Sequence, residues 1–364
     1  MPFRLVCVLP VLTLVVAATA HAQSLNSGEC IGDLDALAPY MLANDAGSAD
    51  YVAQRGRASF DAALATARTT AAAAPNDQAC LEVLRNYLRS AFRRSHLSLR
   101  QIDATVPNAV RASAGAPSFR LLSRQTALII IPTFADQAGG AIEALIKEHA
   151  KDIAQRPNLL VDVRANGGGS DWTYKPLLAL AEANIRRDVG AQIWATPANA
   201  AASRAACDVF APLSQQCRDR MRQEAEAIDR APAGTFIAQP GERPLEIVEP
   251  RDVVPHPRRI GVLVDKGCAS TCEEFLIAMR QSFKVKLFGQ SSTGSLDYSN
   301  LRPWTLPSGK RRLMYATTRS LRLPEFAVDL AGIPPDQVLP TPRGVEDRER
   351  ELAQVQRVLE SARQ

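Results

Sequence analysis

The sequence has few of the features that mark several large classes of protein. Aromatic residues make up only 5% of its 364 positions, and it has 4 histidines. After the first twenty residues, no apolar stretch is long enough to cross a bilayer. The formal net charge is +5, but Lys and Arg are dispersed among Asp and Glu without interleaved aromatics. We therefore expect no membrane span and no nucleic acid partner.

The N-terminus has the pattern of a secretory signal peptide. Arg4 supplies positive charge, residues 5–20 form the apolar stretch, and Ala20-His-Ala22 is a small-residue cleavage site. We expect residues 1–22 to be removed and the mature protein to be periplasmic or secreted. The remaining length of roughly 340 residues is enough for a large α/β core and a smaller accessory region.

An even number of cysteines remains after this cleavage. In an exported protein this favours disulfides over metal ligation. No histidine lies close to a cysteine pair, so zinc binding is the weaker interpretation, and we expect no metal. Sequence proximity alone favours the pairs Cys30–Cys80, Cys207–Cys217 and Cys268–Cys272.

Hydrophobic periodicity predicts an α/β protein with an N-terminal helical region over 23–117, a core over 118–342 and a C-terminal helix over 343–364. The N-terminal region contains expected helices at 62–74 and 80–92 and a connector at 106–117. In the core we expect strands at 126–132, 159–163, 260–264 and 284–288, helices at 139–156, 171–186 and 270–281, a loop at 289–300, and hairpin-like strands through Thr318. Residues 187–258 are expected to be an irregular capping insertion with one helix at 213–230.

Two segments, 159–171 and 260–276, carry most of the functional information. Each is a short apolar strand followed by a tight turn and a helix. Glycines 167–169 in the first turn let backbone N–H groups approach a ligand or a developing oxyanion. Ser270 in the second turn lies at a helix start, where negative charge is favoured. Backbone donors together with a hydroxyl suggest acyl-transfer chemistry.

Each segment also has a simpler interpretation. Ser270-Thr-Cys-Glu273 matches a capping box, in which the serine only caps the helix. Glycine turns after strands are common. The glycine-rich turn lacks the spacing of a dinucleotide-binding fingerprint and the lysine of a phosphate loop.

Together the segments resemble a known family. Asp162-Val-Arg-Ala-Asn166-Gly-Gly-Gly169 is similar to its Asp-x-Arg-x-Asn-x-Gly-Gly signature, and Asp265 to Glu273 resembles its nucleophile segment. Ile130-Ile-Pro-Thr-Phe134 resembles the strand that precedes them. The family is that of the tail-specific (C-terminal processing) and tricorn-core serine peptidases, and the resemblance covers roughly residues 120–340. It implies a ββα spiral core akin to ClpP and crotonases.

The chain departs from many members of this family at the lysine base. Their catalytic lysine lies in a Gly-Lys-Gly loop about 25 residues after the serine, and Ser295 occupies that position here. We therefore expect lysines such as Lys266 and Lys284 to be dispensable for catalysis. There is also no room between the helical region and Ile129 for the PDZ domain that is common in processing proteases. The chain looks more like the tricorn-type branch, which uses a histidine base.

That branch places Ser-His before the core, and Ser95-His96 stands there in this chain. Alternatively, His96 is a helix C-terminal residue whose charge suits the helix dipole. We expect His149 to be solvated and His256 to lie in an extended loop.

The family also has an acidic residue three positions before a Gly-Val/Ile-x-Pro-Asp motif. Asp329 has this place, with Asp for the more usual Glu. Glu325 is a second candidate, and we expect Asp336 to brace a turn.

These residues predict an exported serine hydrolase, specifically a peptidase acting on a peptide or protein substrate without a cofactor. Ser270 is the predicted nucleophile, His96 the base and Asp329 the residue that orients it. The N–H groups of Gly168 and Thr271 are the predicted oxyanion hole. The alternative is a non-catalytic binding module for a hydrophobic ligand or peptide, because the family also has a retinoid-binding branch.

Overall fold

The computed structural model describes residues 14–102, 115–211, 214–251 and 253–361, with side chains described from residue 27 onward. Residues 1–13 of the predicted signal peptide and 106–114 of the predicted connector lie outside this description, and helix α1 (Leu14–Asn44) begins within the signal segment. The chain divides into two compact units. One comprises residues up to 105 with 303–315, and the other comprises 106–302 with 316–364. Across the described residues, no helix is both long and apolar enough to cross a membrane.

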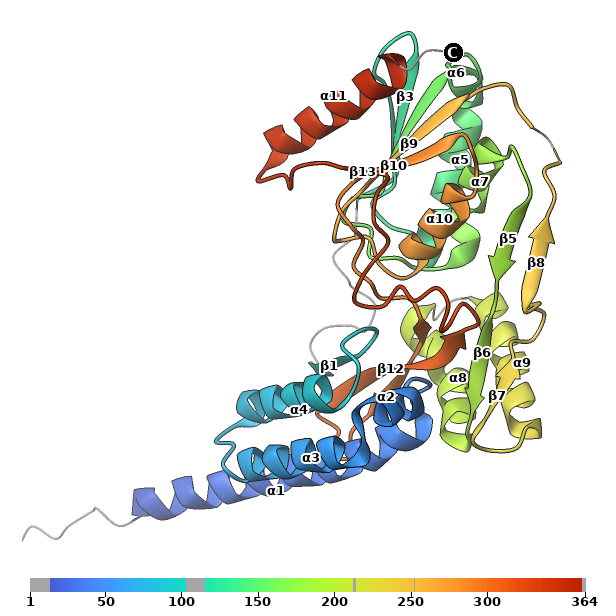
Figure 1. Cartoon of the computed structure of the whole chain (residues 1–364). Helices are drawn as coiled ribbons and strands as arrows, with labels where there is room; N and C mark the ends of the chain where they lie inside the picture. Colours follow the sequence, from blue (N-terminus) through green and yellow to red (C-terminus); the bar gives the residue numbers. More distant parts are fainter. Residues whose placement is uncertain (1–13, 103–114, 212–213, 252, 362–364) are drawn as a thin grey trace, which may run out of the picture. The chain divides into compact units, whose positions relative to one another are not determined.

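The N-terminal unit is helical, as its sequence predicts (Figure 1). Leu37 on the first helix and Leu84 and Leu88 on the fourth belong to its buried core. A disulfide between Cys30 and Cys80 joins these two helices. After α1, the elements are α2 (Ser48–Arg55), α3 (Arg57–Ala72), α4 (Asp77–Ala91) and the short strand β1 (Ser98–Gln101).

A strand from late in the chain also belongs to this unit. The sequence did not predict that this strand would join the N-terminal helices. The first part of β12 (Arg311–Ser320) pairs antiparallel with β1. Arg311 is 1% exposed and pairs with Asp33 at 2.6 Å and with Asp77 at 3.0 Å. A buried guanidinium needs such partners, and these ion pairs fix residues 303–315 to the helices rather than to the core.

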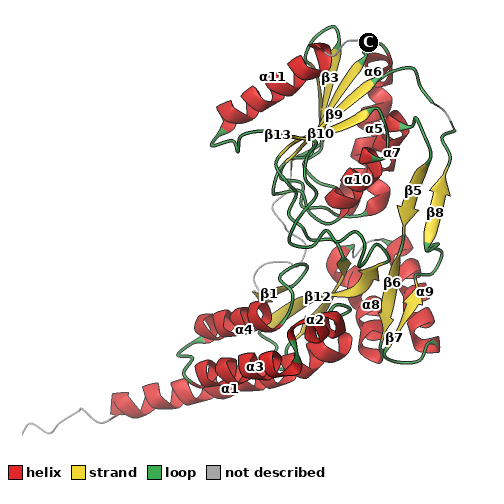
Figure 2. Ribbon diagram, viewed as in Figure 1, coloured by secondary structure: helices red, strands yellow, loops and turns green. Residues whose placement is uncertain are grey.

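The core unit is built on a mostly parallel sheet (Figure 2). Its order is β13-β10-β9-β4-β3-β2, and only β2 runs antiparallel to its neighbour. The carboxyl ends of β4 and β9 therefore meet at one edge, with Asp162 paired to Leu263 in register. The strands are β2 (Ser118–Leu121), β3 (Thr126–Ile130), β4 (Asn158–Asp162), β9 (Arg259–Val264), β10 (Val285–Gly289) and β13 (Gln337–Val338).

Helices cover both faces of this sheet, as the uninterrupted apolar strands require (Figure 1). Val161 and Val262 share a buried cluster with Phe275 of α10, whereas Leu160 and Leu263 pack with Val355 of α11. The first face is covered by α5 (Gly139–Glu148), α6 (Ala150–Ala154), α7 (Lys175–Ala181) and α10 (Thr271–Arg280), and the second by α11 (Val345–Ser361). The expected α/β class with an N-terminal helical region is confirmed.

Two helices are shorter than the sequence predicts. The pattern over 139–156 is broken at His149, which separates α5 from α6. The segment after the glycine-rich turn begins as the 3₁₀ turn η2 (Asp171–Tyr174) and its helix, α7, ends at Ala181. A second 3₁₀ turn, η1 (Asp136–Ala138), leads into α5.

The expectation of an irregular insertion with one helix was wrong. Residues 187–258 contain a second helix, joined to the first by the disulfide Cys207–Cys217, and strands that form two antiparallel pairs, β5 with β8 and β6 with β7. The second part of β12 pairs with β6, and β11 (Tyr298–Thr305) also pairs with β12. The insertion's elements are β5 (Arg186–Val189), β6 (Ala191–Ala195), α8 (Pro197–Phe210), α9 (Gln215–Arg230), β7 (Thr235–Ala238) and β8 (Leu245–Val248).

Candidate active site

The glycine-rich turn after β4 is shaped by buried polar side chains. Arg164 pairs with Asp162 at 2.5 Å and with Glu351 of α11 at 2.8 Å, and all three side chains are buried. Asn166, fully buried, donates to the Ile131 carbonyl oxygen at 3.0 Å. The Asp, Arg and Asn of the signature therefore hold the turn in place.

The second turn, after β9, is tied to the first. Asp265 Oδ1 accepts the N–H groups of Ala165 and Gly267, each at 2.8 Å. A disulfide joins Cys268 to Cys272, so all three bonded pairs are those that sequence proximity favoured. Both of these sulfur-bearing residues are fully buried. This bridge closes around the predicted nucleophile.

Ser270 has an unusual backbone conformation, with φ 57° and ψ −125° at the start of α10. A non-glycine residue with positive φ is strained by about 1–3 kcal/mol and persists only where its surroundings impose it. This half-buried serine forms with Glu273 the capping box that the sequence predicts, and the Glu273 carboxylate accepts the Ser270 N–H at 3.1 Å. The Glu273 N–H also donates to the Ser270 carbonyl oxygen at 2.7 Å. An N-cap residue ordinarily has extended dihedrals, so capping does not explain the positive φ of Ser270.

Gly168 brings the two turns into contact. It has φ +91°, and a Cβ there would lie 2.6 Å from the Ala269 carbonyl oxygen and 2.9 Å from Ser270 Cβ. Only glycine fits this approach. Its predicted role as an oxyanion donor is not supported, because its N–H donates to Asn166 Oδ1 at 3.0 Å. The N–H of Thr271, in the first turn of α10, is the remaining predicted donor.

Two carboxyl groups that the sequence did not single out lie beside the start of α10. The Thr271 hydroxyl donates a hydrogen bond to Asp171 Oδ1 at 2.8 Å. Glu274 pairs with Arg322 at 2.9 Å, and burial raises the pKa of Glu274 to about 7. No local pattern marks Arg322, which comes from the turn after β12.

Glu273 organises the loop that occupies the lysine-base position. Its carboxylate is fully buried and accepts four hydrogen bonds. Burial raises the pKa of Glu273, and these hydrogen bonds oppose the rise. Ser295, at the position of the family's lysine, also accepts the Ser270 N–H at its carbonyl oxygen at 3.1 Å. The four donors to Glu273 are the Ser292 hydroxyl at 2.6 Å and the N–H groups of Gly294 at 2.7 Å, Ser295 at 2.9 Å and Ser270 at 3.1 Å.

The same loop holds Asp329. Asp329 Oδ1 accepts the N–H groups of Leu296 at 2.7 Å and Asp297 at 2.9 Å, and its side chain is half-buried. Glu325, the second candidate, is exposed in the preceding turn. Asp336 accepts the Leu287 N–H at 2.8 Å and so holds strand β10 rather than a turn.

His96 lies in the N-terminal unit, between α4 and β1. It is half-buried and has φ 49°. Because α4 ends at Ala91, His96 is outside the last helical turn, where the dipole interaction would act. The helix C-terminal interpretation of this histidine is therefore wrong.

His149, His256 and Lys284 each have surroundings that suggest a structural role. His149 is not solvated as expected, because its ring stacks on Phe119 with centroids 3.9 Å apart. His256 follows the expected irregular path, between Pro255 and Pro257. Lys284 donates to a main-chain carbonyl oxygen at 3.0 Å, and burial lowers the pKa of Lys284.

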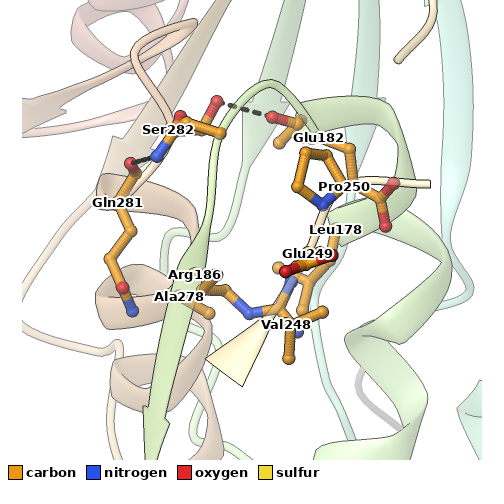
Figure 3. Close-up of a pocket in the computed structure, with 11 residues that line it drawn as sticks. Leu178, Glu182, Arg186, Val248, Glu249, Pro250, Ala278, Gln281 and Ser282 are labelled. Atoms are coloured by element: carbon orange, nitrogen blue, oxygen red, sulfur yellow. Dashed lines mark hydrogen bonds between the residues drawn. The ribbon is translucent and has the colours of Figure 1, made fainter. Parts of the chain in front are cut away.

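The core unit contains a small cavity (Figure 3). Its volume is about 20 Å³, and its lining includes Leu178, Val248, Ala278 and Ser282. It adjoins the C-terminal end of α10, whereas Ser270 precedes the N-terminal end, about 15 Å away along the helix axis. A space of this size holds about one water molecule, so we assign it no role.

Solved structures with a similar fold include peptidases. Mature CPAF in complex with lactacystin matches with a TM-score of 0.61 at 10% identity, covering 93% of this chain and 100% of that one. A candidate peptidase from Parabacteroides merdae matches with a TM-score of 0.56 at 14% identity, covering 92% and 99%. A lipoprotein from Streptococcus agalactiae matches with a TM-score of 0.51 at 15% identity, covering 92% and 96%. At these identities the matches show the fold.

The sequence itself assigns the family. The model of peptidase family S41 matches residues 125–339, which is more than half of the chain. The chain therefore belongs to peptidase family S41, and the resemblance to tail-specific and tricorn-core serine peptidases is confirmed. No sequence among the curated proteins matches it.

Proposed function

We propose that this protein is an exported serine peptidase that cleaves peptide bonds with Ser270 as the nucleophile. Ser270 Oγ attacks the scissile carbonyl carbon, while His96 takes the hydroxyl proton and returns it to the leaving amine. Asp329 holds the imidazole in the productive orientation. Water then releases the acyl group by the same steps. No cofactor takes part in this scheme.

One observation carries the proposal, namely where the backbone is strained. Among the described non-glycine residues, positive φ values occur at Ser270 (57°), His96 (49°) and Leu330 (67°), the neighbour of Asp329. Strain of this kind is concentrated at active sites. It recurs at Ala165 (63°), in the turn that packs beside the serine, and the remaining instance is Asn300 (53°).

The surroundings of the serine suit the charge that develops during attack. The N–H of Thr271 belongs to the first turn of α10, where backbone donors have no intrahelical partner and the helix dipole favours an anion. We assign this N–H to the oxyanion. Gly168 contributes by permitting the close approach of the first turn.

The export assignment rests on two kinds of support. The pattern of residues 1–22 is that of a signal peptide. The three disulfides are typical of proteins that function in oxidising compartments, such as the periplasm or the extracellular space.

A fluorophosphonate probe, which reacts covalently with activated serines, tests the proposal on the oxidised protein. We expect labelling of the wild type, none of Ser270→Ala, and nearly none of His96→Ala. Asp329→Asn should retain more labelling than either. Combining two of the substitutions should add little loss, because residues that act as a unit are non-additive. His149→Gln is the matched histidine control and should label as the wild type does.

Melting temperatures measured on the same proteins separate a chemical effect from unfolding. A folded wild type that is never labelled would overturn the proposal and favour the non-catalytic binding module. Labelling that persists in Ser270→Ala would show that another residue is the nucleophile.

A further inference from the structure

Asp297 and Asp329 form a reciprocal brace, in which the carboxylate of each residue accepts hydrogen bonds from the main chain of the other residue and its neighbour. Asp297 Oδ2 accepts the N–H groups of Val328 and Asp329, each at 2.8 Å. In return, Asp329 Oδ1 accepts the N–H groups of Leu296 at 2.7 Å and Asp297 at 2.9 Å. The loop that begins at Ser295 and the loop that carries Asp329 are thus locked together by four hydrogen bonds, each to a carboxylate oxygen.

Only one oxygen of Asp297 takes part in this brace. The residue is 1% exposed, and within the described part of the chain its Oδ1 atom has no hydrogen-bond partner. An asparagine could accept the same two N–H groups through its single oxygen. Burying a carboxylate costs more free energy than burying an amide, so the brace alone does not explain why an acid is present.

Few charges near Asp297 compensate for its burial. Burial raises the pKa of Asp297 and the Asp329 carboxylate raises it further, whereas the hydrogen bonds from the Asp329 and Val328 N–H groups and the Arg322 charge oppose the rise. Arg322 is itself paired with Glu274 at 2.9 Å. The two aspartates therefore place negative charge close together beside one guanidinium that another carboxylate also uses.

We propose that Asp297 is a positioning residue for catalysis, whose carboxylate fixes that of Asp329 and adds a second negative charge behind it. This inference rests on the proposed function, in which Asp329 orients the base. When the imidazole takes the proton from Ser270 it becomes positively charged, and nearby negative charge stabilises that state. Replacing Asp297 with a neutral residue of the same shape keeps the brace and removes the charge.

The test is the rate of fluorophosphonate labelling at saturating probe, measured together with the probe concentration for half-maximal rate. We expect Asp297→Asn to keep its melting temperature, because the amide oxygen still accepts both N–H groups. Its saturating rate should fall by about tenfold, the effect of losing one nearby unit charge, while the half-maximal concentration stays unchanged. The double variant Asp297→Asn/Asp329→Asn should label no more slowly than Asp329→Asn alone.

Two further variants distinguish the effect of losing the charge from the effect of losing the hydrogen-bond acceptors. Asp297→Ala removes both acceptors and should lower the melting temperature as well as the rate. Asp336→Asn is the matched control, because Asp336 also accepts a main-chain N–H, at 2.8 Å, but outside the proposed machinery. It should label at the wild-type rate.

The outcomes distinguish this inference from the proposed function. If the wild type and Asp297→Asn label at the same rate, Asp297 only braces the loops and the inference is wrong while the proposed function stands. If the folded wild type is not labelled at all, the proposed function fails and this inference falls with it.

Discussion

The Glu273 carboxylate accepts a hydrogen bond from the main-chain N–H of Ser270 at 3.1 Å. A side chain in the first turn of α10 thereby fixes the backbone of the residue that starts the helix. The same fully buried carboxylate also holds Ser292, Gly294 and Ser295. The strained conformation of Ser270 and the loop beside it are therefore set by one acid.

Glu273→Gln should destabilise the protein and impair labelling of Ser270. Both carboxylate oxygens accept two hydrogen bonds, so an amide nitrogen in place of either would face two donors. We expect a loss of about 2–4 kcal/mol in the free energy of unfolding, from buried donors left unpaired. Urea denaturation measures it. Glu226→Gln, on the exposed face of α9, is the control and should be neutral. Equal stability of the two variants would contradict the network.

The local patterns of the two turns were readable from the sequence. Strand, glycine turn and helix follow each other within 159–171 and 260–276, and hydrophobic periodicity is a short-range signal. The contacts that join these segments to the rest of the site were not readable. Asp297 and Asp329 are 32 residues apart, and nothing in the intervening sequence indicates their reciprocal hydrogen bonds.

The insertion was misinterpreted for a related reason. Strand β8 has three exposed residues out of four, so it lacks an alternating apolar pattern. The alanine-rich helix α8 is stabilised by a buried network in which Glu224 accepts from Ser203 at 2.6 Å and pairs with Arg302 at 2.5 Å. Polar contacts of this kind form only in the folded chain and leave no hydrophobic period.

Gly168→Ala should abolish labelling, whereas Gly167→Ala should leave it nearly unchanged. A Cβ added at Gly168 would lie 2.6 Å from the Ala269 carbonyl oxygen, and the alanine would have to adopt φ +91°. A Cβ added at the exposed Gly167 would meet nothing within 4 Å. We expect Gly168→Ala to cost about 1–3 kcal/mol of stability from backbone strain and forced separation of the turns. Thermal melting and probe labelling of the pair check this. Normal labelling of Gly168→Ala would show that contact between the turns is not required.

Removing the disulfide beside the nucleophile should impair labelling more than removing a disulfide elsewhere. Cys268→Ala/Cys272→Ala frees the segment that holds Ser270 at positive φ, and we expect about 2 kcal/mol of destabilisation for so short a loop. Cys207→Ala/Cys217→Ala removes the bridge between α8 and α9 and is the matched control. Labelling rates should be compared below both melting temperatures. An equal or greater loss in the control would argue against a positioning role for the first bridge.

The stability of Glu274→Gln relative to the wild type should be greater at pH 8 than at pH 5. Burial raises the pKa of Glu274 to about 7 from an ordinary 4.5, so between these values the folded protein binds more protons than the unfolded chain. The wild type therefore loses stability as the pH rises through this window, and a neutral amide removes that loss. We expect the variant to gain about 1–3 kcal/mol over the wild type between pH 5 and pH 8, by urea denaturation at both pH values. Glu226→Gln should show no such difference. A Glu274→Gln variant that becomes relatively less stable at pH 8 would mean that its ion pair with Arg322 outweighs the burial of the charge.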